Sequence, residues 1–201
     1  MMGSKVRIRY DGAMAMQRFF ATTFKGLEEV LAGEVAALGG EDVAIAPGGV
    51  SFSGDMALCY RANLWLRSAN RVVALLSEFH APTPAALYEG TREIPWPDLF
   101  PPARTISVDA NVRESGITHS HFAAQKTKDA LVARFRDATG RRPDVDTVSP
   151  DVRVVVRIVR DVCTVSLDTS GESLNRRGDR SSPTGAALKE TLAAGPLLPA
   201  R

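Results

Sequence analysis

The spacing of apolar residues over the first 80 positions most constrains how this 201-residue chain can fold. Apolar residues at intervals of three and four predict a helix, whereas β-branched and aromatic runs with apolar–polar alternation predict strands. The two patterns alternate, with strands expected at 18–24, 43–45, 50–53 and 71–79 and helices at 27–38 and 56–70. The order is β-α-β-β-α-β, which predicts a ferredoxin-like domain over residues 17–80.

The second of these helices carries a specific prediction. Asp55 precedes it and can cap its first turn with a carboxylate oxygen. The residues expected on its buried side are Leu58, Ala62, Trp65, Leu66 and Ala69.

A proline-rich segment at 80–84 predicts a domain boundary, because proline restricts its own φ and the residue before it. Beyond this segment we expect helices at 85–94 and 118–139 and strands at 105–112, 152–160 and 162–168, with prolines breaking 95–102 into a loop. The fold class is therefore α+β, with a second, mixed α/β domain at 85–174. Residues 1–16 are expected to form a disordered extension and residues 175–201 a linker.

Composition alone does not identify a partner. The chain is 44% hydrophobic and 24% charged, as in ordinary soluble globular proteins, and its net charge is only +2. The charge is unevenly spread, however. Residues 126–142 hold six basic and two acidic side chains, a net +4, and residues 175–201 hold five and two, a net +3. Such clusters form a footprint for phosphates or are solvated helix faces, and charge alone does not decide between them.

Motifs of enzyme active sites are missing from the sequence. It contains no GxGxxG after a strand, no P-loop, no HExxH and no GxSxG. Cys59 and Cys163 lie far apart in apolar segments, which predicts two reduced, buried thiols. No run approaches the roughly 18 apolar residues of a membrane span, and the basic N-terminus is not followed by the apolar region of a signal peptide.

The expected helix at 118–139 carries most of the candidate binding residues. His119 and His121 diverge by about 200° on a helix, so they cannot chelate one metal well. Either both are simply polar residues near the helix start, or His121 contacts a phosphate. Lys128 falls at the edge of the apolar face, and its ammonium either extends to solvent or lies beside a groove. The buried stripe is predicted at Leu131, Phe135 and Ala138. The cations expected to point elsewhere are Lys126, Arg136 and Arg142.

Two arginines share one face of the strand expected at 152–160. Arg153 and Arg157 are about 13 Å apart along the strand. They could bracket neighbouring phosphates, or pair with carboxylates such as Asp151 and Asp161, and both alternatives stay open.

Several motifs carry a family resemblance. The longest is Asp-Thr-Ser-Gly-Glu-Ser-Leu-Asn-Arg-Arg-Gly at 168–178, and the others lie at 19–22, 25–28, 48–52, 60–67, 87–90, 119–122, 126–130 and 188–194. They resemble the bacterial THUMP-containing RNA methyltransferases over residues 19–194, in particular the guanine-N2 methyltransferases of 23S rRNA. Asp179 and Ala187 depart from the family pattern, which usually has an aromatic residue and a proline there.

The resemblance implies that residues 85–174 form a THUMP domain and that both domains bind RNA. It also implies a Rossmann-like domain further on, with an S-adenosylmethionine site and an (Asp/Asn)-Pro-Pro-(Tyr/Phe) motif. Neither Asp-Pro-Pro nor Asn-Pro-Pro occurs in this sequence. We therefore expect no catalytic, cofactor-binding or metal-binding residues in this chain, and S-adenosylmethionine only in the full-length parent.

The first hypothesis for function is a cytoplasmic region that recognises structured 23S rRNA and positions it for a methyltransferase domain. The alternative is a free-standing THUMP RNA-binding adaptor, while a membrane or DNA partner is not expected. The absence of a convergent acid, base or nucleophile argues against a small-molecule enzyme. The candidate RNA-contacting residues are His121, Lys126, Lys128, Arg136, Arg141, Arg142, Arg153, Arg157, Arg176, Arg177 and Arg180.

Overall fold

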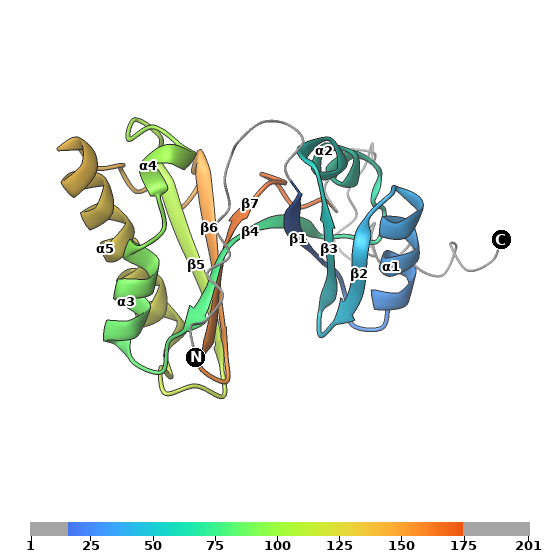
Figure 1. Ribbon diagram of the computed structural model, residues 1–201, viewed down its shortest axis with the longest axis horizontal. Helices are drawn as coiled ribbons and strands as arrows, with labels where there is room; N and C mark the ends of the chain where they lie inside the picture. The colour runs from blue at the N-terminus through green and yellow to red at the C-terminus, as the bar shows by residue number, and fades with distance from the viewer. Residues whose placement is uncertain (1–15, 175–201) are drawn as a thin grey trace, which may run out of the picture. The chain divides into compact units, whose positions relative to one another are not determined.

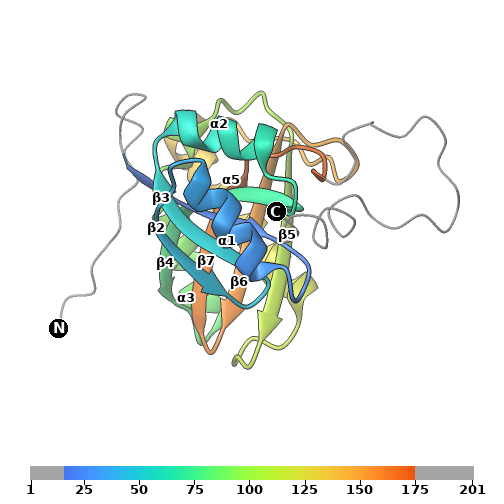
Figure 2. The same ribbon diagram turned by 90° about the vertical axis from the view of Figure 1, so that its right-hand side faces the viewer.

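The computed structural model describes residues 16–174, which form two compact units (Figures 1 and 2). The first unit is built from residues 16–74 and 169–174, and the second from residues 75–168. The division between them falls inside one long strand, between Ala74 and Leu75, whereas the proline-rich segment at 80–84 lies within the second unit. The linker expected at 175–201 lies outside the described residues, as do residues 1–15 of the extension expected at 1–16.

The first unit has the predicted β-α-β-β-α-β order. Its elements are β1 (Gln17–Thr22), α1 (Glu28–Ala37), β2 (Glu41–Ala46), β3 (Gly49–Gly54), α2 (Met56–Trp65) and the first residues of β4 (Arg71–His80). The strands are arranged β2-β3-β1-β4, and each neighbouring pair is antiparallel. Both helices lie on one face of this sheet (Figure 2), where they bury Phe19 and Phe52 together with Leu31 and Leu58. The ferredoxin-like prediction is thus confirmed.

Helix α2 begins as predicted but ends early. The Asp55 carboxylate accepts a hydrogen bond from the Leu58 N–H at 2.7 Å, as expected of a cap. The helix stops at Trp65 rather than near residue 70, because Glu34 binds the backbone that follows. Its carboxylate accepts from the Arg67 N–H at 3.1 Å and the Ser68 N–H at 3.0 Å. Trp65, predicted on the buried side, is 64% exposed, so that prediction is wrong.

The second unit combines three helices and four strands. Its elements after the end of β4 are α3 (Pro84–Arg92), α4 (Trp96–Leu99), β5 (Ile106–Arg113), α5 (Ser120–Thr139), β6 (Val152–Val159) and β7 (Val162–Asp168). The strand order is β4-β7-β6-β5, with β5 and β6 parallel and β6 and β7 joined as an antiparallel hairpin. Arg160 and Asp161, with φ of 48° and 62°, form the tight turn predicted between them. Figure 1 shows α3 and α5 along one face of these strands.

Two local predictions for this unit are wrong. Residues 95–102 contain the short helix α4 where a loop was expected, because the Trp96 side chain is fully buried and its indole N–H donates to the Thr91 carbonyl at 2.9 Å. Proline at the second position of this helix is tolerated, because the N–H groups of the first turn have no carbonyl partners within the helix and no hydrogen bond is lost. In α5, Leu131 and Phe135 are buried as predicted, but Ala138 is exposed because the last turn extends beyond the apolar core.

Among residues 16–174, no helix combines the length and the apolar composition that crossing a bilayer requires.

We predict that neither cysteine reacts with a disulfide reagent such as DTNB in the folded protein at about pH 8. Burial raises the pKa of the Cys59 thiol and raises the pKa of Cys163 to about 12. The thiolate is the nucleophile, and its population falls as the pKa rises above the pH, so both groups stay protonated. A titration should detect no thiol in buffer and two in guanidinium chloride. A stoichiometric reaction in buffer would contradict this.

Candidate nucleic-acid interface

Three cations of the basic stretch at 126–142 surround one hollow of the second unit. Lys128 and Arg136 project from α5 two turns apart, and Arg142 follows the end of the helix. The hollow has a volume of about 520 Å³. Its lining consists of Tyr88, Lys128, Asp129, Val132, Ala133, Arg136, Arg142, Pro143, Asp144 and Val145.

The backbone after α5 returns Arg142 to the side of the helix. Gly140 has a left-handed conformation, with φ of 69°, and its N–H donates to the Arg136 carbonyl. The chain then meets the start of β5, where the Ile106 N–H donates to the Asp144 carbonyl at 2.8 Å. This loop is therefore held at both ends, and Arg142 lines the same hollow as the cations of α5.

This arrangement corrects the expectation that Arg136 and Arg142 point away from Lys128. All three border the same hollow, and the alternative that the Lys128 ammonium lies beside a groove applies. The ammonium is also 2.9 Å from the Asp129 carboxylate. The sequence by itself could not reveal this cluster, because the position of Arg142 depends on a turn that meets another strand.

The chemistry of the hollow suits an anion with an apolar or planar part. Three cations face two carboxylates, Asp129 and Asp144, which leaves an excess of one positive charge. Tyr88, from α3, adds an aromatic ring. In the sequence Tyr88 stands only within a family motif and has no predicted role, since its partners come from other elements.

The candidates near the start of α5 lie apart from the hollow. The exposed His121 ring has its Nε2 3.2 Å from the Gln125 amide nitrogen, and the Lys126 ammonium lies 5.8 Å from the centre of the Phe122 ring. His121 is 15 residues before Arg136, or about 22 Å along the helix. The exposed Arg141 is not among the residues that line the hollow.

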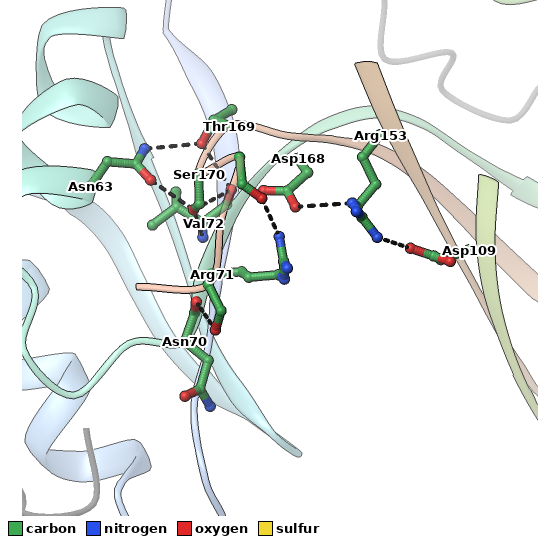
Figure 3. A network of polar contacts seen from close by, with 11 residues as sticks. Asn63, Asn70, Arg71, Val72, Asp109, Arg153, Asp168, Thr169 and Ser170 are labelled. Carbon is green, nitrogen blue, oxygen red and sulfur yellow. Dashed lines mark hydrogen bonds and ion pairs between the residues drawn. The ribbon is translucent and has the colours of Figure 1, made fainter. Parts of the chain in front are cut away.

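Arg153 is held by carboxylates, but not by the two suggested from the sequence. One guanidinium nitrogen is 2.8 Å from Asp109, and another is 4.0 Å from the buried side chain of Asp168 (Figure 3). Asp151 instead accepts from the Thr105 N–H, and Asp161 from the Ser115 hydroxyl and the Gly116 N–H. The Ser115 hydroxyl and the Gly116 N–H, which donate to Asp161, lower the pKa of its carboxyl, the hydroxyl most of all.

Arg153, which is held by carboxylates, and Arg157 are not an equivalent pair. None of the ion pairs among residues 16–174 includes Arg157, which lies half-buried on the same face of β6 as Arg153.

The first residues of the 168–178 motif are structural. The Asn63 amide donates to the Thr169 hydroxyl at 3.0 Å and accepts from the Ser170 hydroxyl at 2.7 Å (Figure 3). The Ser170 hydroxyl also accepts from the Val72 N–H at 2.8 Å. Further along, the Leu174 N–H donates to the Asn70 carbonyl at 2.9 Å. These bonds join residues 169–174 to the first unit, although the sequence pattern had assigned them to the second domain.

Three candidates, Arg176, Arg177 and Arg180, lie outside the described residues.

Two family profiles match the chain. A profile described as the RlmL ferredoxin-like domain matches residues 18–73, and the THUMP domain profile matches residues 83–168. Among curated proteins, the chain is 45% identical over 186 residues to the ribosomal RNA large subunit methyltransferase K/L of Methylococcus capsulatus. The match covers 92% of this chain and 25% of that protein, so the chain spans about a quarter of the length of such relatives.

Solved structures resemble the chain as well. A protein from Listeria monocytogenes described as a predicted N6-adenine-specific DNA methylase superposes with a TM-score of 0.82 at 33% identity, covering 92% of this chain and 48% of that one. A structure described as a methyltransferase complexed with SAH superposes with a TM-score of 0.80 at 30% identity, covering 91% and 48%.

We predict that Asn63→Ala loosens residues 169–174 without unfolding the second unit. The change removes one donor and one acceptor and leaves the hydroxyls of Thr169 and Ser170 short of partners, which should cost about 1–3 kcal/mol. Hydrogen exchange followed by mass spectrometry should show faster exchange in 169–174 than in the parent. Asn111→Ala, at an exposed position of β5, is the matched control and should change neither region. Equal exchange in all three proteins would show that the network does not hold this segment.

Proposed function

Since the chain consists of an RlmL-type ferredoxin-like domain joined to a THUMP domain, we propose that it is the RNA-recognition region of an rRNA methyltransferase. Its substrate is structured 23S rRNA in the cytoplasm, and the reaction is transfer of a methyl group to a guanine N2. The name of the Methylococcus relative, which refers to the large ribosomal subunit, supports this substrate. We assign catalysis to the part of the full-length protein that this chain does not span.

The observation that carries the proposal is the cluster of Lys128, Arg136 and Arg142 around one hollow of the THUMP domain. Phosphates supply most of the affinity of proteins for RNA, and A-form helices are recognised by shape and backbone because their major groove is too narrow for side chains. A concave surface with an excess of cations meets that requirement. Arg157 and the basic residues at the start of α5, His121 and Lys126, would extend the contact to further phosphates.

The described residues do not fit S-adenosylmethionine, although a solved relative is described as complexed with SAH. This cofactor carries a sulfonium and an ammonium against one carboxylate, a net positive charge. The hollow has an excess of one positive charge, which disfavours a ligand that is itself positive. We therefore place the S-adenosylmethionine site in the methyltransferase domain of the full-length protein, and no step of the reaction is assigned to this chain.

We predict that Arg136→Ala/Arg142→Ala weakens binding to a structured 23S rRNA fragment and reduces its dependence on salt. Removing one cation that neutralises a phosphate should lower the slope of log K against log salt by roughly 0.7–0.9. Fluorescence anisotropy with a labelled fragment, repeated across salt concentrations, measures both quantities. The slope should fall by about 1.4–1.8 for the double variant.

The matched control is Arg113→Ala/Arg160→Ala, which removes the same charge. Arg113 ends β5, about 23 Å along the strand from Ile106, whose N–H binds the loop that carries Arg142. The exposed Arg160 follows β6 and pairs with Glu114. Equal slopes for the two double variants would show that the hollow is not the RNA site. A parallel titration of Arg176→Ala/Arg177→Ala tests whether the residues after 174 add phosphate contacts, as we also propose.

A further inference from the structure

The outward face of α2 exposes three large apolar side chains within six residues. Tyr60 and Leu64 are each 65% exposed and Trp65 is 64% exposed. At 100° per residue, the exposed positions of the helix span an arc of about 140° that begins at Tyr60 and ends at Trp65, with the exposed Arg61 between them. The opposite arc is buried in the core of the first unit through Leu58, Cys59, Ala62 and Leu66.

Because these three side chains are mostly exposed, they contribute little to the hydrophobic core of the first unit. Contiguous exposed apolar groups on a folded domain mark sites that bind something. Tyrosine, tryptophan and arginine are frequent both in protein interfaces and on surfaces that stack nucleobases. These residue types therefore do not distinguish a protein partner from a nucleic acid, whereas the charge of the surface does.

The charge favours a polyanion. Residues 56–70 contain no aspartate or glutamate, and Arg61 and Arg67 are both exposed. None of the ion pairs among residues 16–174 includes either arginine. As a whole, the described part of the first unit is acidic, with seven acidic and five basic residues, a net −2. Two of its five cations thus lie beside the exposed rings.

The surface is also held rigidly at both ends of the helix. Asp55 caps the first turn, and Glu34 accepts hydrogen bonds from the Arg67 and Ser68 N–H groups. The Ser68 carbonyl in turn accepts from the Thr23 hydroxyl at 2.6 Å. Because the Glu34 carboxylate binds the backbone, it positions the loop that carries Arg67 while no ion pair joins it to the Arg67 guanidinium. A platform that is already ordered loses little entropy when it binds.

We infer that the outward face of α2 is a stacking platform for unpaired nucleotides of the RNA, with Tyr60 and Trp65 contacting bases and Arg61 and Arg67 contacting phosphates. This inference rests on the proposed function, because it assumes that RNA is the ligand. It adds a second contact, in the ferredoxin-like domain, that differs in kind from the hollow of the THUMP domain. The two rings are about 7.5 Å apart along the helix axis, so each can meet a different base.

The test compares two labelled RNAs, a blunt hairpin and the same hairpin with a short unpaired oligoadenosine tail. Trp65→Ala should weaken binding of the tailed RNA by about 5- to 150-fold, the range expected for one base stacked on an aromatic ring, and should leave the blunt hairpin unchanged. Trp65→Phe keeps a ring and should retain most of the affinity. Ile45→Ala, at another exposed apolar position of the same unit, is the matched control and should affect neither RNA.

Tryptophan fluorescence supplies an independent signal. The chain has two tryptophans, and Trp96 is fully buried, so quenching by the tailed RNA should come from Trp65 and disappear in Trp65→Phe. Arg61→Ala/Arg67→Ala should flatten the salt dependence for the tailed RNA alone. Thermal melting of each variant confirms that it is folded, as expected for changes at exposed positions.

The outcomes separate this inference from the proposed function. If both RNAs bind and Trp65→Ala binds the tailed one as the parent does, the platform is overturned while RNA recognition stands. If Trp65→Ala weakens both RNAs equally, the effect is not stacking of unpaired bases and the inference fails. If neither RNA binds the parent chain, both the inference and the proposed function fail. If the variant changes only self-association, the face binds protein and the inference is again overturned.

Discussion

The return of the chain to the first unit after residue 168 is the constraint on which the rest of the structure depends. The first unit is built from residues 16–74 and 169–174, so the whole second unit falls between its two segments in sequence. The Asn63 amide secures the return, because it donates to one hydroxyl of the returning segment and accepts from the next. Contacts between residues about 100 positions apart carry a loop-closure cost, and the second unit folds within that loop.

The ion pairs of the second unit distinguish cations that maintain the fold from cations available to a ligand. Arg153 and Arg160 are both held by carboxylates, and the exposed pair of Arg160 with Glu114 contributes little to stability because water screens it. These pairs position the elements that they join, as Arg153 of β6 does with Asp109 of the neighbouring strand β5. Around the hollow, Lys128 also pairs with Asp129, but the cations outnumber the carboxylates, which favours a positive potential at this concave surface. Local charge density in the sequence did not separate these two groups.

The two surfaces proposed for RNA differ in their physical chemistry. The hollow of the THUMP domain offers charge, and its contribution depends on the release of counterions and hence on salt. The platform on α2 offers aromatic rings, whose stacking on bases depends far less on salt and requires that the bases be unpaired. An RNA with paired and unpaired parts would use both. Each surface lies within its own domain and is formed by residues of that domain alone.

The elements of the chain were largely determined by local sequence. Apolar spacing predicted the β-α-β-β-α-β order, Asp55 predicted the start of α2, and the Arg160-Asp161 turn was predicted between two strands, because each depends on residues within a few positions. Local pattern failed where a distant group intervened. Glu34 binds the backbone at residues 67 and 68 and ends α2 early, and the burial of Trp96 accompanies a short helix among prolines.

The candidate site was predicted only in part, for the same reason. The sequence identified the basic stretch and the individual cations, since residue type and spacing are visible in it. It could not show that Lys128, Arg136 and Arg142 share one hollow with Tyr88, that Arg153 is neutralised by Asp109, or that the Thr169-Ser170 motif binds Asn63. Those pairings join elements far apart in the chain. Tertiary structure alone decided them, because a charge or a hydroxyl acquires its role from the groups that packing brings within a few ångströms.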